Sequence, residues 1–293
     1  MTLPPILFHY FQTPLPYART LALQEKLHAL QLSTRRTSPG SHPDLLLLLQ
    51  HRPVYTFGRR QSQPSIGTEE DENDREHARL KALGADSVCT ARGGLVTYHG
   101  PGQLVGYPLF DLSRPSPSHP TPIPIRTYIS LLIRTITHHL QHTHSLVTAP
   151  CAHTGVFLDE HTKVASVGVQ VRHRLTTHGF SLNVTKEPIE WFDRVVACGL
   201  EGVRAGCIEE AVQRISAGIE GAQSKPSQLT VPSIIPSLVS TFGNVFNREM
   251  RALDMDTEGE VQDAVRELEK DAKMAGDWLR APLEVGDLRS EPS

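Results

Sequence analysis

The chain has 293 residues, of which 39% are hydrophobic and 21% are charged, and its formal net charge is -3 at pH 7. A chain of this size can bury a full core, and we expect one domain with decorations. The slight negative charge argues against a protein that coats nucleic acid, because such proteins carry a strong basic excess. No apolar run reaches the ~18 residues of a membrane-spanning helix, so no membrane partner is expected.

The first half of the chain predicts strands that alternate with helices. Ile6 to Tyr10 is typical of a strand, and the leucine spacing from Tyr17 to Gln31 predicts a helix. The run from Leu45 to Leu49 indicates a buried strand. The polar segment from Gln61 to Arg79 predicts an exposed loop that continues into a helix. Val88 to Tyr107 is strand-like but rich in glycine, so its backbone is expected to approach a ligand or turn sharply.

The second half begins with a segment rich in proline and serine, near 113–124, which predicts a surface insertion. Ile125 to Leu140 has the periodicity of an amphipathic helix that packs on a sheet. Val164 to Val171 alternates like a strand, and Ser181 to Val184 predicts a strand beside it. The remaining predictions are a polar link over 223–228, a helix over 234–246 and a charged helical extension over 254–279. Together these elements predict an α/β or α+β fold with a mixed sheet flanked by helices.

The glycine-rich segment from Arg92 to Gln103 is the first of three clusters of candidate functional residues. It lacks the GK[ST] of a P-loop and misses the GxGxxG spacing, so a nucleotide site is weakly supported. Its glycines can let backbone amides face a ligand carbonyl, with Arg92, Tyr98 and His99 as nearby polar groups. On the residues alone, a structural glycine turn and a binding site explain the segment equally well.

The second and third clusters supply a lysine and a cysteine. Lys163 stands at the start of an apolar stretch, where an ordinary lysine extends its ammonium to solvent. Cys198 lies between an apolar stretch and a glycine, which fits an exposed thiol at a turn, although a lone cysteine is more often buried. Cys151 and Cys207 are predicted to be of the buried kind. With Cys89 they complete the four cysteines, whose spacing fits neither a disulfide framework nor a zinc site and favours a reducing compartment.

A histidine-rich stretch raises the alternative of a metal site. Its members are His138, His139, His142, His144 and His153. His138 and His142 are one turn apart on the predicted helix, but no glutamate completes an HExxH pattern. A solvated helix face is the preferred interpretation, and a non-catalytic metal-binding protein is the alternative from another functional class.

Taken together, the motifs resemble the lipoate-biosynthesis octanoyltransferases, which move an octanoyl group from acyl carrier protein to a lysine of lipoyl-bearing domains. The resemblance covers residues 16 to about 246 and includes RGGLVTYHGPGQLVGYPLFDL, TGVF, KVASVGV, THGFSLNV and ACGLEG. It implies the α/β fold shared with biotin protein ligases and lipoate ligases. It further implies a catalytic domain over 1–250 that carries the Pro-rich insertion, followed by a charged, helical to disordered extension over 251–293.

The resemblance also assigns roles to residues. The family's acyl-thioester cysteine falls on Cys198, and the lysine that activates its sulfur falls on Lys163. The implied substrate contacts are Arg92, Gly93, Gly94, Leu95, Val96, Thr97, Tyr98, His99, Ser166, Val167, Gly168, Gly179, Phe180 and Ser181. Two departures are Ala197, where the family usually has proline, and Phe157, where it usually has tryptophan. Neither departure removes a reacting group.

The resemblance implies no cofactor and no metal. The implied partners are octanoyl-acyl carrier protein and, as acceptors, the lipoyl domains of 2-oxoacid dehydrogenases and the glycine-cleavage H protein. Because these partners are acidic, Arg59, Arg60, Arg172 and Arg174 form a hypothetical docking rim, with a merely solvated surface as the alternative. The competing enzyme is an ATP-dependent lipoate or biotin ligase of the same fold, which needs no cysteine nucleophile.

The expected location follows from function, because the sequence offers no clear targeting signal. The first basic residue is Arg19, so the start of the sequence shows neither a secretory n-region nor an Arg-rich transit pattern. The Pro/Ser insertion and the charged tail resemble eukaryotic members, which act in mitochondria. We therefore expect a mitochondrial location, or the cytoplasm if the protein is bacterial.

Overall fold

The computed structural model describes residues 3–38, 40–59, 68–114, 121–195, 202–217 and 229–284. The strands of its large sheet are β1 (Ile6–Tyr10), β2 (Asp44–Leu49), β6 (Gln103–Leu109), β7 (Val156–Asp159), β8 (Thr162–Arg172), β9 (Leu175–Asn183), β10 (Arg204–Ala205) and β11 (Met250–Ala252). Their order is β10-β8-β9-β6-β2-β1-β11, with β7 paired to β8, and parallel and antiparallel pairs are mixed. The predicted mixed α/β fold is confirmed.

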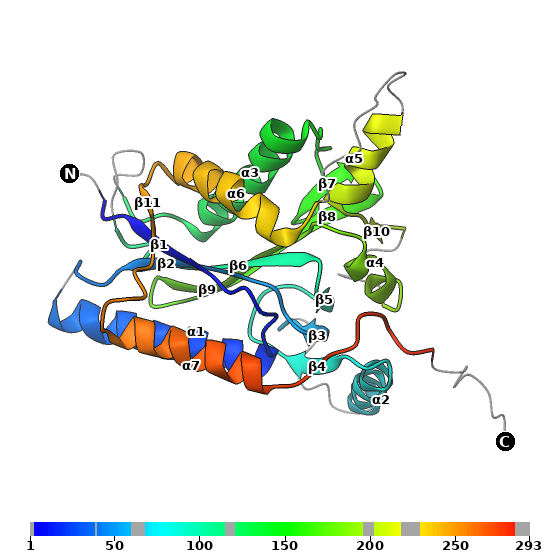
Figure 1. Cartoon of the computed structure of the whole chain (residues 1–293), viewed down its shortest axis with the longest axis horizontal. Coiled ribbons are helices and arrows are strands. Elements are labelled where there is room, and N and C mark those ends of the chain that lie inside the picture. Colours follow the sequence, from blue (N-terminus) through cyan, green and yellow to red (C-terminus); the bar gives the residue numbers. More distant parts are fainter. Residues whose placement is uncertain are drawn as a thin grey trace.

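Helices cover both faces of this sheet (Figure 1). On one face lie α3 (Ile125–His144) and α6 (Val231–Phe246), and on the other lie α1 (Tyr17–Thr37) and α7 (Glu260–Met274). The helix α5 (Ile208–Ala217) was not predicted from the sequence. No helix within the described ranges is long and apolar enough to cross a membrane.

The leucine run of β2 shows why both faces need cover. Leu46 and Leu48 belong to the apolar cluster under α3 and α6, whereas Leu45, Leu47 and Leu49 belong to the cluster under α1 and α7. Successive strand residues point to opposite faces, so a strand that is buried on both sides reads as a continuous apolar run. The predicted buried strand is confirmed.

A second, smaller sheet lies beside the first. Its strands are β3 (Val54–Phe57), β4 (Asp86–Cys89) and β5 (Thr97–His99), in the order β4-β3-β5. The helices α2 (Thr68–Ala82) and α4 (Glu187–Phe192) contact it. Tyr98 stacks on Trp191 with a centroid distance of 5.2 Å. Because β5 continues into β6 through a tight turn, the glycine-rich segment joins the two sheets.

The pair β8 and β9 confirms the two neighbouring strands that the sequence predicted, in antiparallel register. However, β9 begins at Leu175, whereas the prediction began at Ser181. The early part is polar, and its polar groups are paired with distant elements. Thr176 Oγ1 donates to Pro108 O at 2.7 Å, and the N–H of His178 donates to Gln24 Oε1 at 2.7 Å. Hydrogen bonds to residues so distant in the sequence cannot be predicted from the hydrophobic pattern of the segment itself.

The residues after 250 pack with those before it. β11 pairs with β1, and Val265 and Leu268 of α7 join the apolar cluster that contains Leu23 and Leu27 of α1. The charged helix predicted over 254–279 is shorter, Glu260–Met274. A domain boundary at 250 stays a prediction. Of the predicted insertion at 113–124, residues 115–120 lie outside the described ranges, as does the polar link at 223–228.

Beyond α7, residues 275–284 run across the small sheet toward α2 and α4, a segment we term the C-terminal strap (Figure 1). The guanidinium of Arg52 donates to the carbonyls of Ala272, Ala275 and Gly276 at 3.1, 2.6 and 2.9 Å. It also lies 5.2 Å from the ring centroid of Trp278. The N–H of Leu283 donates to the carbonyl of Leu83 at 3.0 Å. The strap therefore ties α7 to the small sheet.

We expect Arg52→Gln to lower the free energy of unfolding by about 1–2 kcal/mol, because three carbonyls at the end of α7 lose a charged donor. Urea denaturation followed by circular dichroism measures the change. The matched control is Arg126→Gln on exposed helix surface, for which a change within about 0.5 kcal/mol is expected. Equal effects of the two substitutions would contradict a tethering role for Arg52.

Candidate functional site

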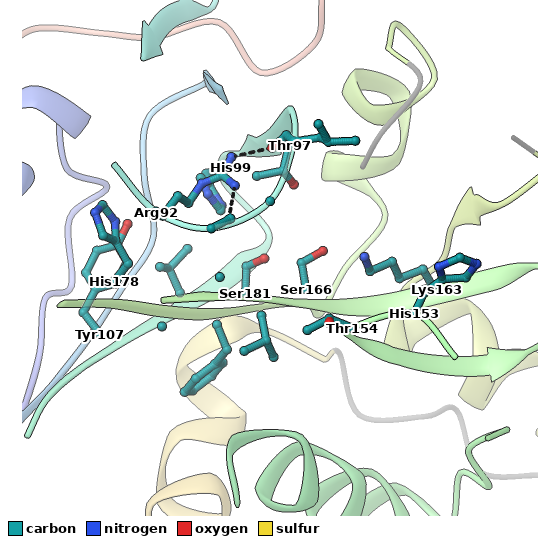
Figure 2. A pocket seen from close by; sticks show the side chains of 18 of the residues that line it. Arg92, Thr97, His99, Tyr107, His153, Thr154, Lys163, Ser166, His178 and Ser181 are labelled. Atoms are coloured by element: carbon teal, nitrogen blue, oxygen red, sulfur yellow. Dashed lines mark hydrogen bonds between the residues drawn. The ribbon is translucent and has the colours of Figure 1, made fainter. Parts of the chain in front are cut away.

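A cavity of about 240 Å³ lies between the glycine-rich segment and the strands β8 and β9 (Figure 2). Its floor is formed by facing residues of the two strands, with Ser166 opposite Ser181 and Gly168 opposite Gly179. Lys163 and His153 lie at one end of the cavity, and Tyr107 and His178 lie at the other. The full lining is Tyr17, Arg92, Gly93, Gly94, Leu95, Thr97, His99, Val105, Tyr107, Ala152, His153, Thr154, Lys163, Ser166, Val167, Gly168, His178, Gly179, Phe180 and Ser181.

The structure brings most of the predicted substrate contacts together at this cavity, but Val96 and Tyr98 are not in its lining. Both belong to the apolar cluster of the small sheet. The strand alternates, so Thr97 and His99 face the cavity while Tyr98 faces α4. The prediction took every residue from Arg92 to His99 as a substrate contact and so did not account for this alternation.

The side chain of Arg92 is buried and is bonded to the glycine-rich segment itself. Its Nη2 donates to the carbonyls of Thr56 and Leu95 at 2.6 and 3.0 Å and to Thr56 Oγ1 at 2.7 Å. Its Nη1 donates to the carbonyl of Gly93 at 3.1 Å. These bonds tie the loop formed by residues 92–95, the roof of the cavity, to β3. Arg92 therefore determines the shape of the roof.

Glycine is required where the roof meets its surroundings. A Cβ on Gly58 would lie 2.2 Å from the carbonyl oxygen of Gly94, and one on Gly168 would lie 3.0 Å from that of Gly93. The roof is also bonded to the floor, since the N–H of Gly93 donates to the carbonyl of Val169 at 3.2 Å. On the floor, a Cβ on Gly179 would lie 2.2 Å from the carbonyl oxygen of Gly106. Close backbone approach explains the glycines of this site.

The inner wall of the cavity contains buried aromatic side chains. His51 lies behind it, with Nδ1–H donating to Leu15 O at 3.1 Å and Nε2 accepting from the Tyr107 hydroxyl at 2.7 Å. Burial lowers the pKa of His51 to about 4 and, with Arg92 nearby, that of His178 to about 3. Both imidazoles are therefore neutral near pH 7. Tyr17 and Tyr107 were not predicted, since α1 and β6 bring them in from distant parts of the chain.

Lys163 points toward the cavity from its outer end, near Ser166 (Figure 2). Its ammonium lies 5.6 Å from the ring centroid of Phe157, and a Cβ on Gly155 would lie 2.6 Å from Lys163 Cε. The aliphatic stem is thus packed along Gly155 while the charge faces an aromatic ring. An aromatic ring therefore contacts the lysine even though phenylalanine replaces the expected tryptophan.

Cys198 lies in 196–201, outside the described residues, but the segments on either side are described. Before it, α4 contacts the small sheet. After it, Ala205 of β10 pairs with Lys163 of β8, and the N–H of Gly206 donates to the carbonyl of Lys163 at 2.9 Å. Val203 and Ala205 line a smaller cavity that Lys163 and Ser166 also line. The chain that carries Cys198 therefore rejoins the described fold beside Lys163.

The other cysteines differ from one another. Cys207 is buried, as predicted, and burial raises the pKa of its thiol to about 11, which keeps it protonated. Cys151 is exposed, so its predicted burial is wrong, because it lies in the loop before β7 and not in the sheet.

The histidine-rich stretch does not form a uniform solvated face. His139 is fully buried, and burial lowers its pKa to about 4, so that part of the prediction is wrong. It lies against His144 at a ring-centroid distance of 5.1 Å. Its place on the packed side of α3 explains its burial. Within the part of the chain that the structure describes, no group of three or more His, Cys, Asp or Glu side chains could hold a metal ion.

Comparison with known proteins agrees with this geometry. Residues 16–242 match the model of the lipoyl protein ligase A/B catalytic domain. The chain is 32% identical to the mitochondrial octanoyl-[acyl-carrier-protein]:protein N-octanoyltransferase of Homo sapiens, over 79% of this chain and 89% of that protein. It is 31% identical to an octanoyltransferase of Thermobifida fusca, over 75% of this chain and 91% of that protein.

Solved structures show the same fold at low sequence identity. A putative lipoate protein ligase from T. acidophilum superposes with a TM-score of 0.54 at 13% identity, covering 92% of this chain and 95% of that one. A lipoate-protein ligase A bound with ATP gives a TM-score of 0.52 at 12% identity, with coverage of 92% and 95%. The chain belongs to the lipoyl protein ligase A/B catalytic-domain family. Within that family it is an acyltransferase of the octanoyltransferase kind.

Two glycines of the site provide a test of the backbone packing. We expect Gly179→Ala to lower the free energy of unfolding by about 1–3 kcal/mol, because its Cβ would overlap the carbonyl of Gly106. Gly93→Ala is the matched control, since its Cβ would have only an ordinary contact, 3.7 Å from Val169 O. Thermal unfolding of both variants measures the difference. A Gly179→Ala variant as stable as Gly93→Ala would show that β9 and β6 can separate without cost.

Proposed function

We propose that this protein transfers an octanoyl group from octanoyl-acyl carrier protein to a specific lysine of lipoyl domains, through a thioester on Cys198. The observation that carries the proposal is the position of Lys163 at the outer end of the cavity, beside the strand to which the Cys198 segment returns. The names of the relatives supply the donor and the acceptor classes. The structure of a related archaeal lipoate protein ligase with its E2 lipoyl domain is consistent with such an acceptor.

In the first step, the Cys198 thiolate attacks the carbonyl carbon of the donor thioester. The new C–S bond forms as the C–S bond to the carrier breaks, and the carrier thiolate leaves and takes up a proton from the Lys163 ammonium. One thioester replaces another, so the exchange is nearly isoenergetic and needs neither ATP nor a redox partner. A cation beside the sulfur favours the thiolate that this step requires.

In the second step, the amine of the acceptor lysine attacks the Cys198 thioester. An amide bond forms, the Cys198 thiolate is expelled, and the proton lost by the amine passes to Lys163. Formation of an amide from a thioester is downhill. Backbone N–H groups near the reacting carbonyl are suited to stabilise the oxyanion, a contribution of roughly 3–4 kcal/mol per donor in enzymes where it was measured.

The cavity floor leaves space for an acyl chain, because Gly168 and Gly179 carry no side chain above the strands. The histidines of the inner wall are neutral, so an acyl chain that binds beside them does not have to displace water from a charged group. An enclosed acyl group is also protected from hydrolysis while it waits on the sulfur. Relatives described as mitochondrial favour a mitochondrial location for the transfer.

The second candidate is an ATP-dependent lipoate ligase, since a lipoate-protein ligase A bound with ATP has the same fold. A ligase adenylates its acid and needs no cysteine nucleophile, so the two candidates differ in their need for ATP and for Cys198. The octanoyltransferase relatives at 31% and 32% identity favour the transferase.

Intact-mass analysis after incubation with octanoyl-acyl carrier protein tests the proposal. Wild type is expected to gain one octanoyl group without ATP, and Cys198→Ala to gain none. Lys163→Ala is expected to lower the overall transfer rate by roughly 10²- to 10⁴-fold, the usual effect of losing a general acid–base group. Cys151→Ala is the matched control, because Cys151 is an exposed cysteine that should be dispensable. Octanoylation of Cys198→Ala, or strict dependence on ATP, would reject the thioester mechanism.

We further propose that basic residues near the roof dock the acidic carrier proteins. Arg59 is exposed, and its N–H donates to the carbonyl of Arg92 at 2.9 Å, so it lies next to the cavity roof. Near the turn between β8 and β9, Arg174 is exposed, and Arg172 is paired with Glu25 at 2.6 Å. Arg60 lies outside the described residues. Of this hypothetical rim, Arg59 therefore has the clearest structural support.

Charge reversal tests this surface. The double substitution Arg59→Glu and Arg60→Glu is expected to lower kcat/KM for the carrier substrate roughly 10-fold or more at low salt, and the loss should shrink as salt rises. Steady-state rates over a series of salt concentrations measure the effect. Arg126→Glu, which reverses one exposed charge elsewhere, is the control. If the rate and its salt dependence do not change, docking through Arg59 and Arg60 is excluded.

A further inference from the structure

His99 occupies an unusual position in the cavity. Its side chain is buried, with 7% of the residue exposed, and it belongs to the lining. The ring nitrogen Nδ1 lies 2.7 Å from Gln103 Oε1. Among the hydrogen bonds of the described chain, none involves the other ring nitrogen, Nε2. One nitrogen of His99 is therefore held by the protein while the other is available to a substrate.

The orientation of Gln103 follows from the groups around it. Its Nε2 lies 3.2 Å from the carbonyl of Tyr98 and 2.9 Å from Asn183 Oδ1. In turn, Asn183 Nδ2 lies 2.9 Å from the carbonyl of Gly206. Backbone carbonyls can only accept hydrogen bonds, so the amide nitrogens of both side chains must point toward them. Gln103 Oε1 is left facing His99, and it can only accept.

The tautomer of His99 is then determined. Because Gln103 Oε1 accepts, His99 Nδ1 must carry the proton. Burial, together with the nearby His51 and Arg92, holds the pKa of His99 well below its usual value, so the ring is neutral near pH 7. A neutral imidazole with its proton on Nδ1 has a lone pair on Nε2. Nε2 is thus a hydrogen-bond acceptor that resists protonation.

We propose that Gln103 and Asn183 are positioning residues that hold His99 in this tautomer, so that Nε2 accepts a hydrogen bond from the amine of the acceptor lysine. The inference rests on the proposed function and concerns its second step. A neutral amine has two N–H groups and one lone pair, so anchoring one N–H at Nε2 directs the lone pair toward the thioester. Because Nε2 resists protonation, the proton released in the attack does not stay on His99 and passes to Lys163.

The same network reaches the segment that holds Lys163. The peptide of Gly206 accepts from Asn183 Nδ2 through its carbonyl, and its N–H donates to the carbonyl of Lys163. His99 and Lys163 are thereby connected through buried hydrogen bonds across β6, β9 and the end of β10. This connection fixes the two groups that contact the attacking amine relative to one another.

The tautomer is tested first on the unmodified protein. The ring ¹⁵N shifts and long-range ¹H–¹⁵N couplings of ¹⁵N-histidine-labelled protein at pH 7 distinguish the two tautomers and the cation. His99→Gln identifies the His99 signals by their loss. We expect the proton on Nδ1 in wild type and a shift toward the Nε2–H tautomer in Gln103→Met. A wild-type ring that is cationic or protonated on Nε2 would overturn the proposal, whatever the enzymatic activity.

The kinetic test separates the two half-reactions. The enzyme is first loaded with octanoyl groups from octanoyl-acyl carrier protein and then mixed with a lipoyl domain, and intact mass follows each step. We expect Gln103→Met to slow the second step about 10-fold and to leave the first within about twofold, since misplacing a positioned group can cost up to about 10²-fold. His99→Gln keeps an acceptor at the place of Nε2 and should retain more transfer activity than His99→Leu.

Two controls separate positioning from general destabilisation. Gln31 is another buried glutamine, and its Nε2 donates to the carbonyls of Pro43 and Leu109 at 2.9 Å each. Gln31→Met should therefore affect stability but not the second step. In a His99→Leu background, Gln103→Met should have no further effect on transfer, because Gln103 acts only through His99.

The outcomes are distinguishable. Wild type that never forms the acyl-enzyme would reject the proposed function, while the tautomer measurement would still decide the role of Gln103. If the His99 and Gln103 variants slow acyl-enzyme formation as much as transfer, Nε2 binds the N–H of the donor's thioester arm and our assignment to the amine is wrong. A His99→Leu variant with wild-type transfer would also overturn it.

Discussion

The site depends on one buried cation, the guanidinium of Arg92, and on the carbonyls around it. Its bonds to the carbonyls of Thr56 and Leu95 tie the roof loop to the small sheet, while the N–H of Gly93 ties the same loop to β8 of the large sheet. A buried charge is costly unless its donors are satisfied. Here carbonyls of the roof loop and of β3 accept hydrogen bonds from these donors. The same bonds therefore stabilise the buried cation and determine the shape of the cavity.

Local sequence patterns predicted the strands that are buried through their own apolar side chains. The leucine run of β2 and the alternation of β8 were confirmed because their burial follows from the strand itself. The start of β9 escaped prediction, since the Thr176 hydroxyl and the backbone N–H of His178 find their hydrogen-bond acceptors, Pro108 O and Gln24 Oε1, elsewhere in the fold. The C-terminal strap escaped for the same reason, because its partners Arg52 and Leu83 lie far away in the sequence, just before β3 and just after α2.

Site residues that belong to a local motif were predicted from the sequence, whereas those that tertiary packing brings to the cavity were missed. The glycine-rich motif identified the roof, and strand alternation, applied to it, would have excluded Tyr98. By contrast, Tyr17 and Tyr107 reach the cavity only through the packing of α1 and β6, which no motif records. The exposure of Cys151 likewise depends on where the loop before β7 lies.

Arg92 also sets the electrostatics of the cavity that it shapes. Its charge adds to burial in lowering the pKa of His99 and His178, so these imidazoles stay neutral at pH values where a free histidine begins to bind protons. A cavity with neutral imidazoles can offer lone pairs as acceptors without removing protons from a substrate. The task of accepting the amine's proton then falls to Lys163 at the outer end, as proposed. Within this scheme the histidine orients the nucleophile and the lysine deprotonates it, because the guanidinium lies close enough to the imidazoles to disfavour a second positive charge among them.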